Sequence, residues 1–250
     1  MSPTVEVIIH PVCLRFRWEA DELVYLFAAN PDQQLDGMER MLGIGPEGGA
    51  PIFETNLGFL PVASTVLIRG ERTLLVDPGN HHIGSYGILR HALRARGLDY
   101  GDIDVVVTTH THTDHAAAIV QFAGRPWVLG AGEFAAMEAI EGAPIVAAKR
   151  SMMGPVTEVP AGGETVLMPG VTALHTPGHT PGHISLSVET AEGRVLIAGD
   201  QTMTRSEYET RAFSQWYPPE TLAELNRSLD RVQALAPDLV IPGHDRPFRP

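Results

Sequence analysis

Residue types that bind metal ions are concentrated in one short segment, Thr108-Thr109-His110-Thr111-His112-Thr113-Asp114-His115. It follows the apolar run Ile103-Asp104-Val105-Val106-Val107, which predicts a buried strand, so the donors lie where this strand ends. Imidazole and carboxylate groups withdrawn from water are costly unless they have partners. A metal ion is the partner that this set of donors predicts.

The spacing within the segment divides the donors into two groups. His110 and His112 are two residues apart, so in an extended backbone they project to the same side and can share one ion. Asp114 and His115 begin the next element and point elsewhere. Asp114 by itself fits a helix N-cap equally well, and a lone histidine is more often structural, but three histidines at this spacing favour metal binding.

Further donors occur in a recurring setting, where an apolar strand meets a turn that contains glycine. They are His179 in Thr176-Pro177-Gly178-His179-Thr180-Pro181-Gly182-His183, Asp200 after Leu196-Ile197-Ala198-Gly199, and His244 after Ile241-Pro242-Gly243. Glycine before a ligand lets the backbone approach an ion closely. The recurrence argues against chance.

Strands and helices alternate around these donors, which is typical of a layered α/β fold. The hydrophobic patterns predict strands over 5–9, 22–27, 62–68, 73–76, 103–107, 127–129, 165–168, 171–175, 184–188, 194–198 and 239–241. They predict helices over 85–96, 116–122, 133–140 and 220–235. Two stretches marked by glycine and proline should be irregular: 43–51, a surface connection or a flap near the site, and 142–163, a surface excursion.

Composition describes an ordinary globular chain of 250 residues, with 44% apolar residues and a net charge of -12. No run of lysine and arginine occurs, which argues against a nucleic-acid or anionic-membrane partner. Cys13 is the single cysteine, so no internal disulfide is possible. The start of the sequence resembles neither a signal peptide nor a membrane span, which predicts a soluble, cytoplasmic protein.

The ligand pattern over residues 62 to 245 resembles that of the metallo-β-lactamase-fold superfamily, whose signature is HxHxDH followed by a downstream His, Asp and His. The resemblance implies a four-layer αββα sandwich, here one domain over 1–250 with 1–60 as an N-terminal extension that caps the site or forms a dimer contact. It implies one metal held by His110, His112 and His179, a second held by Asp114, His115 and His244, and Asp200 bridging both.

The same resemblance assigns supporting roles outside the ligand set. Asp77 matches the aspartate that ends an early strand and supports the cluster, although Pro78 follows it where Thr is more usual. His183 is expected to be supporting or structural. Apart from the resemblance, the position of His175 on a strand predicts a core or supporting histidine, and the pair His81-His82, on a loop after Asp77, either touches substrate or lies exposed.

Two divalent ions bridged by one carboxylate lower the pKa of a shared water from about 15.7 towards 7, which yields a hydroxide nucleophile. Asp114 and Asp200 are the expected catalytic carboxylates, and Asp114 would orient the hydroxide or pass a proton to the leaving group. Ligands without a thiolate suit zinc, but also manganese, cobalt or iron.

Among family members, the layout is similar to the N-acyl homoserine lactone lactonases and glyoxalase II. Only residues 245–250 follow His244, so the helical glutathione-binding domain of glyoxalase II is not expected. The lactonases place a Tyr three residues past the bridging Asp to polarise the carbonyl, whereas this chain has Met203, which cannot donate a hydrogen bond. Tyr208 is a candidate substitute.

Met203, Tyr208, Phe213 and Trp216 are the candidate substrate contacts, with Trp18, Phe53, Phe59 and Tyr217 as further aromatic candidates for the pocket wall. Packing in the core or at a dimer contact explains the aromatic residues equally well.

The expected function is a lactonase-like hydrolase that acts on a small ester or lactone. Three enzymatic alternatives remain within the fold: a phosphodiesterase or ribonuclease, favoured by an ending from Pro242 to Phe248 similar to that of small family members proposed to act on RNA; a thioesterase; and a mononuclear iron persulfide dioxygenase. A non-enzymatic metal-binding module is disfavoured, because a structural zinc needs only four ligands. A homodimer is a further possibility.

Overall fold

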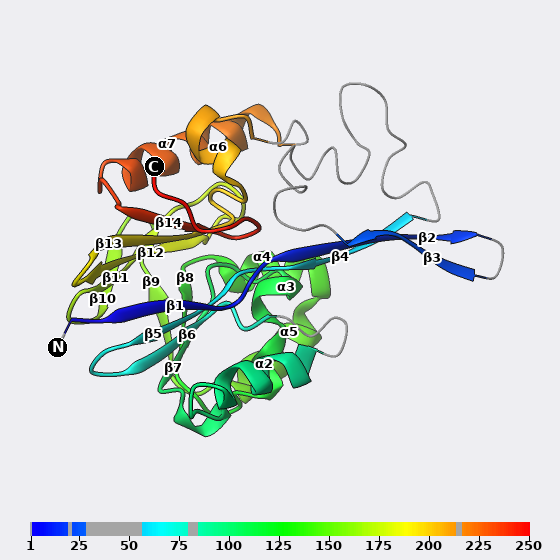
Figure 1. The fold of residues 1–250 in the computed structure, drawn as a ribbon, viewed down its shortest axis with the longest axis horizontal. Coiled ribbons are helices and arrows are strands. Elements are labelled where there is room, and N and C mark those ends of the chain that lie inside the picture. The colour runs from blue at the N-terminus through cyan, green and yellow to red at the C-terminus, as the bar shows by residue number, and fades with distance from the viewer. Residues whose placement is uncertain (1, 20–21, 29–56, 80–84, 214–216) are drawn as a thin grey trace.

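The computed structural model describes residues 2–19, 22–28, 57–79, 85–213 and 217–250, and side chains are described for 2–11, 62–79, 88–213 and 217–250. Two large sheets and a small one form its framework (Figure 1). The six-stranded sheet has the order β1 (Thr4–Ile9), β5 (Thr65–Arg69), β6 (Thr73–Val76), β7 (Val105–Val107), β8 (Trp127–Gly130) and β9 (Val156–Val159). The five-stranded sheet has the order β10 (Glu164–Met168), β11 (Val171–His175), β12 (Ile184–Thr190), β13 (Gly193–Gly199) and β14 (Leu239–Pro242).

The small sheet has the order β3 (Glu22–Ala28), β2 (Val12–Glu19) and β4 (Leu57–Val62), and it extends to one side of the two packed sheets (Figure 1). The helices of the described residues are α2 (Ser85–Arg94), α3 (Thr113–Ala116), α4 (Glu133–Glu141), α5 (Ala143–Met152), α6 (Arg205–Thr210) and α7 (Pro219–Gln233), with 3₁₀ turns η3 (Tyr100–Asp102) and η4 (Ala117–Val120). No helix among the described residues is long and apolar enough to cross a membrane.

The two large sheets pack face to face, and each is covered by helices on its outer face. The shared core between the sheets contains Val66, Ile68, Leu74 and Val107 of the first and Leu186, Val188 and Ile197 of the second. The alternate residues Leu67, Leu75 and Val106 turn to the opposite side, against Leu89 and Leu93 of α2. Leu196 and Val240 of the second sheet pack against Leu225 and Leu229 of α7. The predicted four-layer αββα sandwich is therefore confirmed.

Strand ends at one edge of this sandwich carry the polar segments of interest. Strands β6 and β7 are parallel and end before Asp77 and Thr108, and β13 and β14 are parallel and end before Asp200 and Gly243. β7 consists of three buried valines, as expected for a strand covered on both faces. The carboxyl ends of parallel strands are where α/β folds place their sites.

Most predicted elements are present, and three predictions need correction. The strand predicted over 62–68 is interrupted at Ala63 and Ser64, where the Ser64 hydroxyl donates to the Pro242 carbonyl at 2.8 Å. The helix predicted over 116–122 begins earlier, as α3, and continues as the 3₁₀ turn η4. The stretch 142–163, predicted to be an irregular excursion, contains α5 and β9. Pro144 does not prevent the helix, because it lies in the first turn of α5, where a proline is well tolerated.

Several elements were not predicted at all. β2 and β4 form most of the small sheet, and α6 is closed by a capping box in which Thr204 and Glu207 bond each other's backbone N–H. The stretch 43–51 and the pair His81-His82 lie outside the described residues.

Candidate metal centre

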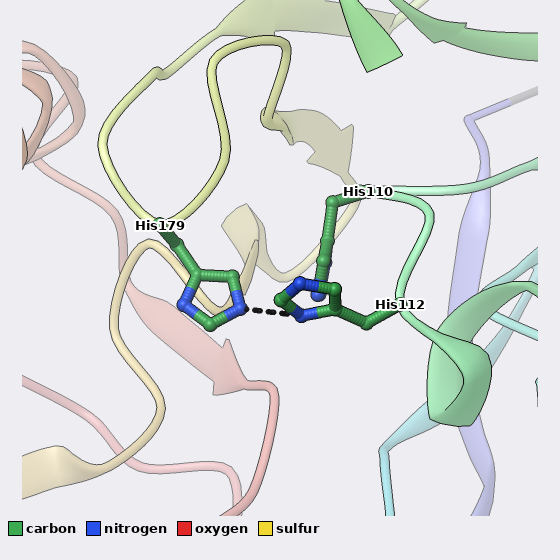
Figure 2. A group of neighbouring side chains, drawn as sticks. All are labelled: His110, His112 and His179. Carbon is green, nitrogen blue, oxygen red and sulfur yellow. Dashed lines mark hydrogen bonds between the residues drawn. The ribbon is translucent and has the colours of Figure 1, made fainter. Parts of the chain in front are cut away.

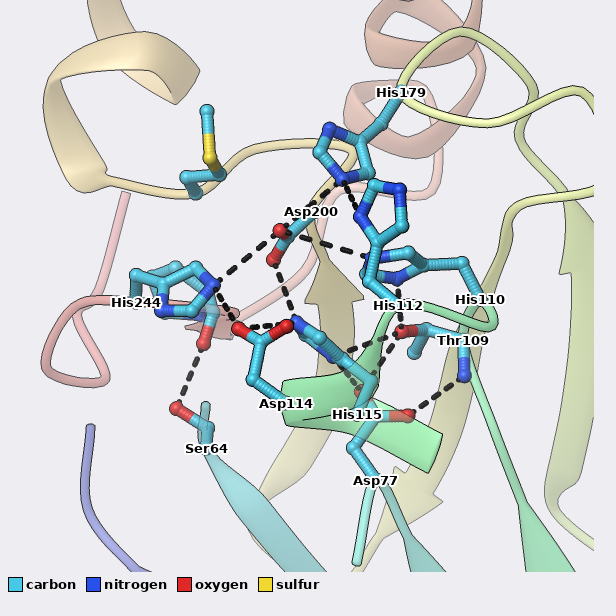
Figure 3. Close-up of polar contacts among 12 residues, drawn as sticks. Ser64, Asp77, Thr109, His110, His112, Asp114, His115, His179, Asp200 and His244 are labelled. Atoms are coloured by element: carbon cyan, nitrogen blue, oxygen red, sulfur yellow. Dashed lines mark hydrogen bonds and ion pairs between the residues drawn. The ribbon is translucent and has the colours of Figure 1, made fainter. Parts of the chain in front are cut away.

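Side chains from five segments converge at the sheet edge (Figure 3). His110 and His112 follow β7, and Asp114 and His115 lie in the first turn of α3. His179 comes from the loop after β11, Asp200 follows β13, and His244 follows β14. Every candidate ligand predicted from the sequence therefore lies in this one cluster.

The first group of donors is His110, His112 and His179, whose ligand atoms all lie within 4.8 Å of one another. His112 Nδ1 and His179 Nε2 are 3.0 Å apart (Figure 2). The ring centroids of His110 and His112 are 4.5 Å apart, at an interplanar angle of 81°. Three nitrogen donors facing a common point match the ligand arrangement of a tetrahedral site with one open position.

The second group of donors is Asp114, His115 and His244, again within 4.8 Å. Asp114 Oδ2 lies 3.3 Å from His244 Nε2 and 3.6 Å from His115 Nε2. Asp114 is in the first turn of α3, whose N-cap position is occupied by His112. The N-cap alternative for Asp114 is therefore wrong.

Asp200 lies between the two groups. Its Oδ2 is 3.4 Å from His179 Nε2 and 3.3 Å from His244 Nε2, and its Oδ1 is 3.4 Å from His115 Nε2. One carboxylate thus faces histidines of both groups, which is the position that a bridging ligand needs. Asp200 is 5% exposed.

One direct observation shows that the described residues fit bound divalent metal. His110 Nε2, His115 Nε2 and Asp200 Oδ1 are buried and have no hydrogen-bond partner in the described part of the chain. Orphaned polar atoms of this kind cost free energy, and three of them facing one centre are explained by ions. Imidazole and carboxylate donors accept zinc, manganese, cobalt or iron.

Asp77 supports the cluster from behind His115. Its Oδ2 is 2.9 Å from His115 Nδ1, and its Oδ1 and Oδ2 accept from the Thr109 backbone N–H and hydroxyl at 2.7 and 2.8 Å. The Asp77 backbone has a φ of 50°, a conformation that aspartate tolerates better than most residues. With Nδ1 bonded to a carboxylate, His115 directs Nε2 at the centre.

His183 supports Asp200 in a similar way. The Asp200 backbone N–H donates to His183 Nε2 at 3.1 Å, so the His183 proton lies on Nδ1 and is donated to the Thr176 hydroxyl at 2.9 Å. Within the described part of the chain, by contrast, the His175 ring bonds only backbone groups, the Gly162 N–H and the Pro181 carbonyl. His183 therefore has a supporting position and His175 a structural one.

Glu133 is a residue that the sequence analysis missed. Its buried carboxylate accepts from the Thr111 N–H at 2.7 Å and the Thr111 hydroxyl at 2.9 Å, and also from the Thr180 hydroxyl and the Gly182 N–H. It thereby ties the loop of His112 to the loop of His179. The available signal was a glutamate directly after Gly130-Ala131-Gly132 at a strand end, in the setting that also marks Asp200.

Burial and charge divide the histidines into two protonation classes in the metal-free protein. Burial lowers the pKa of His110, of His112 and of His183, and it lowers that of His179 to about 3. Burial also disfavours charge on His115 and His244, but the Asp200 and Asp114 carboxylates outweigh it and raise both pKa values, that of His244 to about 10. In the metal-free protein, protonated His115 and His244 therefore supply positive charge beside the carboxylates of Asp114 and Asp200.

These shifts predict how the stability of the metal-free protein depends on pH. The raised pKa of His244 contributes stability below its usual value of 6.5, and this is lost as pH rises towards about 10. The lowered pKa of His179 costs stability as pH falls from 6.5 towards about 3. Denaturation with a chelator present should give maximal stability near pH 6.5, with losses at about pH 5 and about pH 9. A profile that rises steadily across this range would contradict the assignment.

The candidate substrate contacts occupy different places. Tyr208 and Phe213 are buried in the core cluster under α7, and the Tyr208 ring packs on Phe248 with centroids 5.4 Å apart. Both side chains therefore pack in the core, and this position does not support Tyr208 as the substitute for the carbonyl-polarising Tyr of the lactonases. Met203 is next to the centre, since its carbonyl accepts from the His244 N–H at 2.9 Å. Trp216 lies outside the described residues, as do Phe53 and the side chains of Trp18 and Phe59.

Comparison with known proteins agrees with the geometry. The family model described as the Metallo-beta-lactamase superfamily matches residues 57–244. An N-acyl homoserine lactonase of Bacillus sp is 29% identical over 154 residues, which is 61% of this chain and 60% of that protein. A probable metallo-hydrolase of Methanocaldococcus jannaschii is 27% identical over 198 residues, which is 73% of this chain and 87% of that protein.

The solved structure of a quorum-quenching N-acyl homoserine lactone lactonase is similar, with a TM-score of 0.62 and 26% identity. The match covers 76% of this chain and 81% of that one. The chain spans about 60% of the length of the curated N-acyl homoserine lactonase that it matches.

Proposed function

Because the chain belongs to the metallo-β-lactamase superfamily, we propose that it is a dinuclear metal-dependent hydrolase that cleaves a small ester or lactone. The observation that carries the proposal is the position of Asp200, which faces His179 on one side and His115 and His244 on the other. A site for one ion needs no such carboxylate, since three protein ligands and a water suffice.

In this proposal His110, His112 and His179 would hold one ion, Asp114, His115 and His244 would hold the other, and Asp200 would be shared between them. Divalent ions, when bound, lower the pKa of water towards about 7 and stabilise negative charge on a carbonyl oxygen. Asp114, whose side chain is 13% exposed and lies 3.3 Å from His244 Nε2, would orient the attacking water and pass its proton to the leaving alkoxide. Asp77 and His183 keep His115 and Asp200 in place.

Two observations support an ester or lactone substrate over an anionic one. The curated relative and the solved structure described above are named as lactonases of N-acyl homoserine lactones. The chain also carries a net charge of -12, which disfavours polyanions such as RNA. The Met203 side chain has no hydrogen-bond donor for a carbonyl, and in this proposal bound ions would polarise the carbonyl instead.

The substrate class is tested with a panel measured on metal-loaded protein. An N-acyl homoserine lactone, a simple lactone, an aryl ester, a thioester and an aryl phosphodiester cover the reactions of interest. The proposal expects turnover of the lactone or ester and little of the phosphodiester. A protein that hydrolyses only the phosphodiester or the thioester, or that consumes oxygen with a persulfide and one iron per chain, would overturn the substrate assignment.

A further inference from the structure

The second ring nitrogen of His179 has a specific partner. His179 Nδ1 lies 2.5 Å from the Tyr217 hydroxyl oxygen, and the two rings meet edge to face with centroids 6.1 Å apart. In Figure 2 the nitrogen of His179 that is not bonded to His112 points away from His110 and His112. Tyr217 therefore contacts His179 on the side opposite the candidate metal centre.

The protonation of the His179 ring follows from what surrounds it. Nε2 faces His112 Nδ1 at 3.0 Å and Asp200 Oδ2 at 3.4 Å, so it is the atom that would bind an ion, and it must do so without a proton. A neutral imidazole then carries its proton on Nδ1 and needs an acceptor there. The phenol oxygen of Tyr217 is that acceptor, in the same relation that the Asp77 carboxylate has to His115 Nδ1.

Helix α7 fixes both partners of this contact. Tyr217 directly precedes Pro218, and the Pro218 carbonyl accepts from the Leu222 N–H in the first turn of the helix at 3.0 Å. The same helix holds the loop of His179, because its Ser228 hydroxyl donates to the Pro177 carbonyl at 2.6 Å. A Cβ at Gly178 would lie 2.7 Å from Leu225, so loop and helix pack without space between them. The hydroxyl is thus held in place beside His179.

We propose that Tyr217 is a positioning residue, whose hydroxyl fixes the tautomer and orientation of His179 and so sets the affinity of the ion position formed by His110, His112 and His179. The inference rests on the proposed dinuclear site and adds a residue to it. Tyr217 does not touch the reacting atoms in this account. It acts through His179, as partners of metal-binding histidines do in other proteins.

A Tyr217→Phe variant tests the proposal, because it keeps the ring and removes the hydroxyl. Competition with a chelator should show one of the two metal equivalents bound about 10–100-fold more weakly, with the other unchanged. The visible spectrum of the cobalt-loaded protein should change, since cobalt reports the ligand field of the altered position. Melting of the metal-free protein should stay close to that of the wild type. Tyr100→Phe is the matched control, because Tyr100 packs on Phe122 in a different cluster.

The outcomes separate the inference from the function on which it rests. Wild-type affinity at both metal positions of Tyr217→Phe would overturn the positioning role and leave the proposed hydrolase intact. Equal weakening of both positions together with a lower melting temperature of the metal-free variant would also overturn it, as a general structural effect. A wild-type protein that binds no metal would overturn the proposed function first.

Discussion

An Asp200→Ala variant is expected to lose hydrolytic activity by more than about 100-fold. Mutating a residue that merely supports a metal ligand typically lowers metal affinity or activity by about 10–100-fold. Asp200 faces both proposed ion positions directly, so its loss should cost more. Loss of the bridging carboxylate should also lower the metal content below that of the wild type. Activity on the lactone or ester and metal content should be measured on the same preparation, with circular dichroism to check the fold.

Asp200 is buried among charged groups, so the alanine variant carries a risk for folding. His112→Ala is the second variant, since His112 is only half-buried and its removal leaves the carboxylate network intact. Asp230→Ala is the matched control, because Asp230 is an exposed carboxylate on α7 that pairs with Arg211. Wild-type turnover by a folded Asp200→Ala or His112→Ala protein would be incompatible with the metal mechanism.

A Gly243→Ala variant is expected to damage the same site through backbone packing. A Cβ at Gly243 would lie 1.9 Å from Asp200 Oδ1 and 3.1 Å from the carbonyl carbon of Gly199. The turn has little freedom to retreat, because the Gly243 N–H donates to the Gly199 carbonyl at 2.9 Å and its carbonyl accepts from the Ser64 N–H at 2.8 Å. Overpacking of this kind costs about 1–3 kcal/mol of stability. The displaced carboxylate should weaken metal binding by about 10–100-fold.

Urea denaturation and chelator competition measure the two effects of Gly243→Ala separately. Gly101→Ala is the matched control, because the nearest atom to its Cβ is Arg125 Nη2 at 3.7 Å. We expect Gly101→Ala to retain both stability and metal affinity. A Gly243→Ala protein that binds two ions as tightly as the wild type would show that the turn and Asp200 are not packed as described.

The ligand set could be predicted from the sequence because each member is encoded locally. His110 follows a run of buried valines, and Asp200 and His244 each follow a short apolar strand and a glycine. Such patterns place side chains at strand ends without knowledge of the rest of the chain. Parallel strands then bring those ends to one edge of the sandwich, so the local signals coincide in space.

The partners of the ligands could not be predicted in this way, because they come from distant segments. Glu133 is 47 residues from Thr180, and Tyr217 is 38 residues from His179. In the sequence, Glu133 resembles any glutamate at the start of a helix, and Tyr217 is one of several aromatic residues in its segment. Helix α5 was not predicted for a different reason, because glycine and proline mark the stretch 142–163, and Pro144 is nevertheless compatible with the first turn of a helix.

The substrate candidates show a third limit. Tyr208 and Phe213 are aromatic residues near the site in sequence, but apolar burial against α7 explains their positions. Nothing in the sequence distinguishes an aromatic side chain that packs in a core from one that lines a pocket. Among the described candidates, Met203 and Tyr217 are adjacent to the centre, Met203 through its carbonyl bond to His244 and Tyr217 through its contact with His179.

The most direct test of a dinuclear centre is the metal content of the active protein, measured by elemental analysis beside its rate on an N-acyl homoserine lactone or simple ester. Two divalent ions per chain are expected, with loss of the rate on chelation and its return when the second equivalent is restored. Full activity with one ion per chain, or with none, would contradict the proposed dinuclear centre.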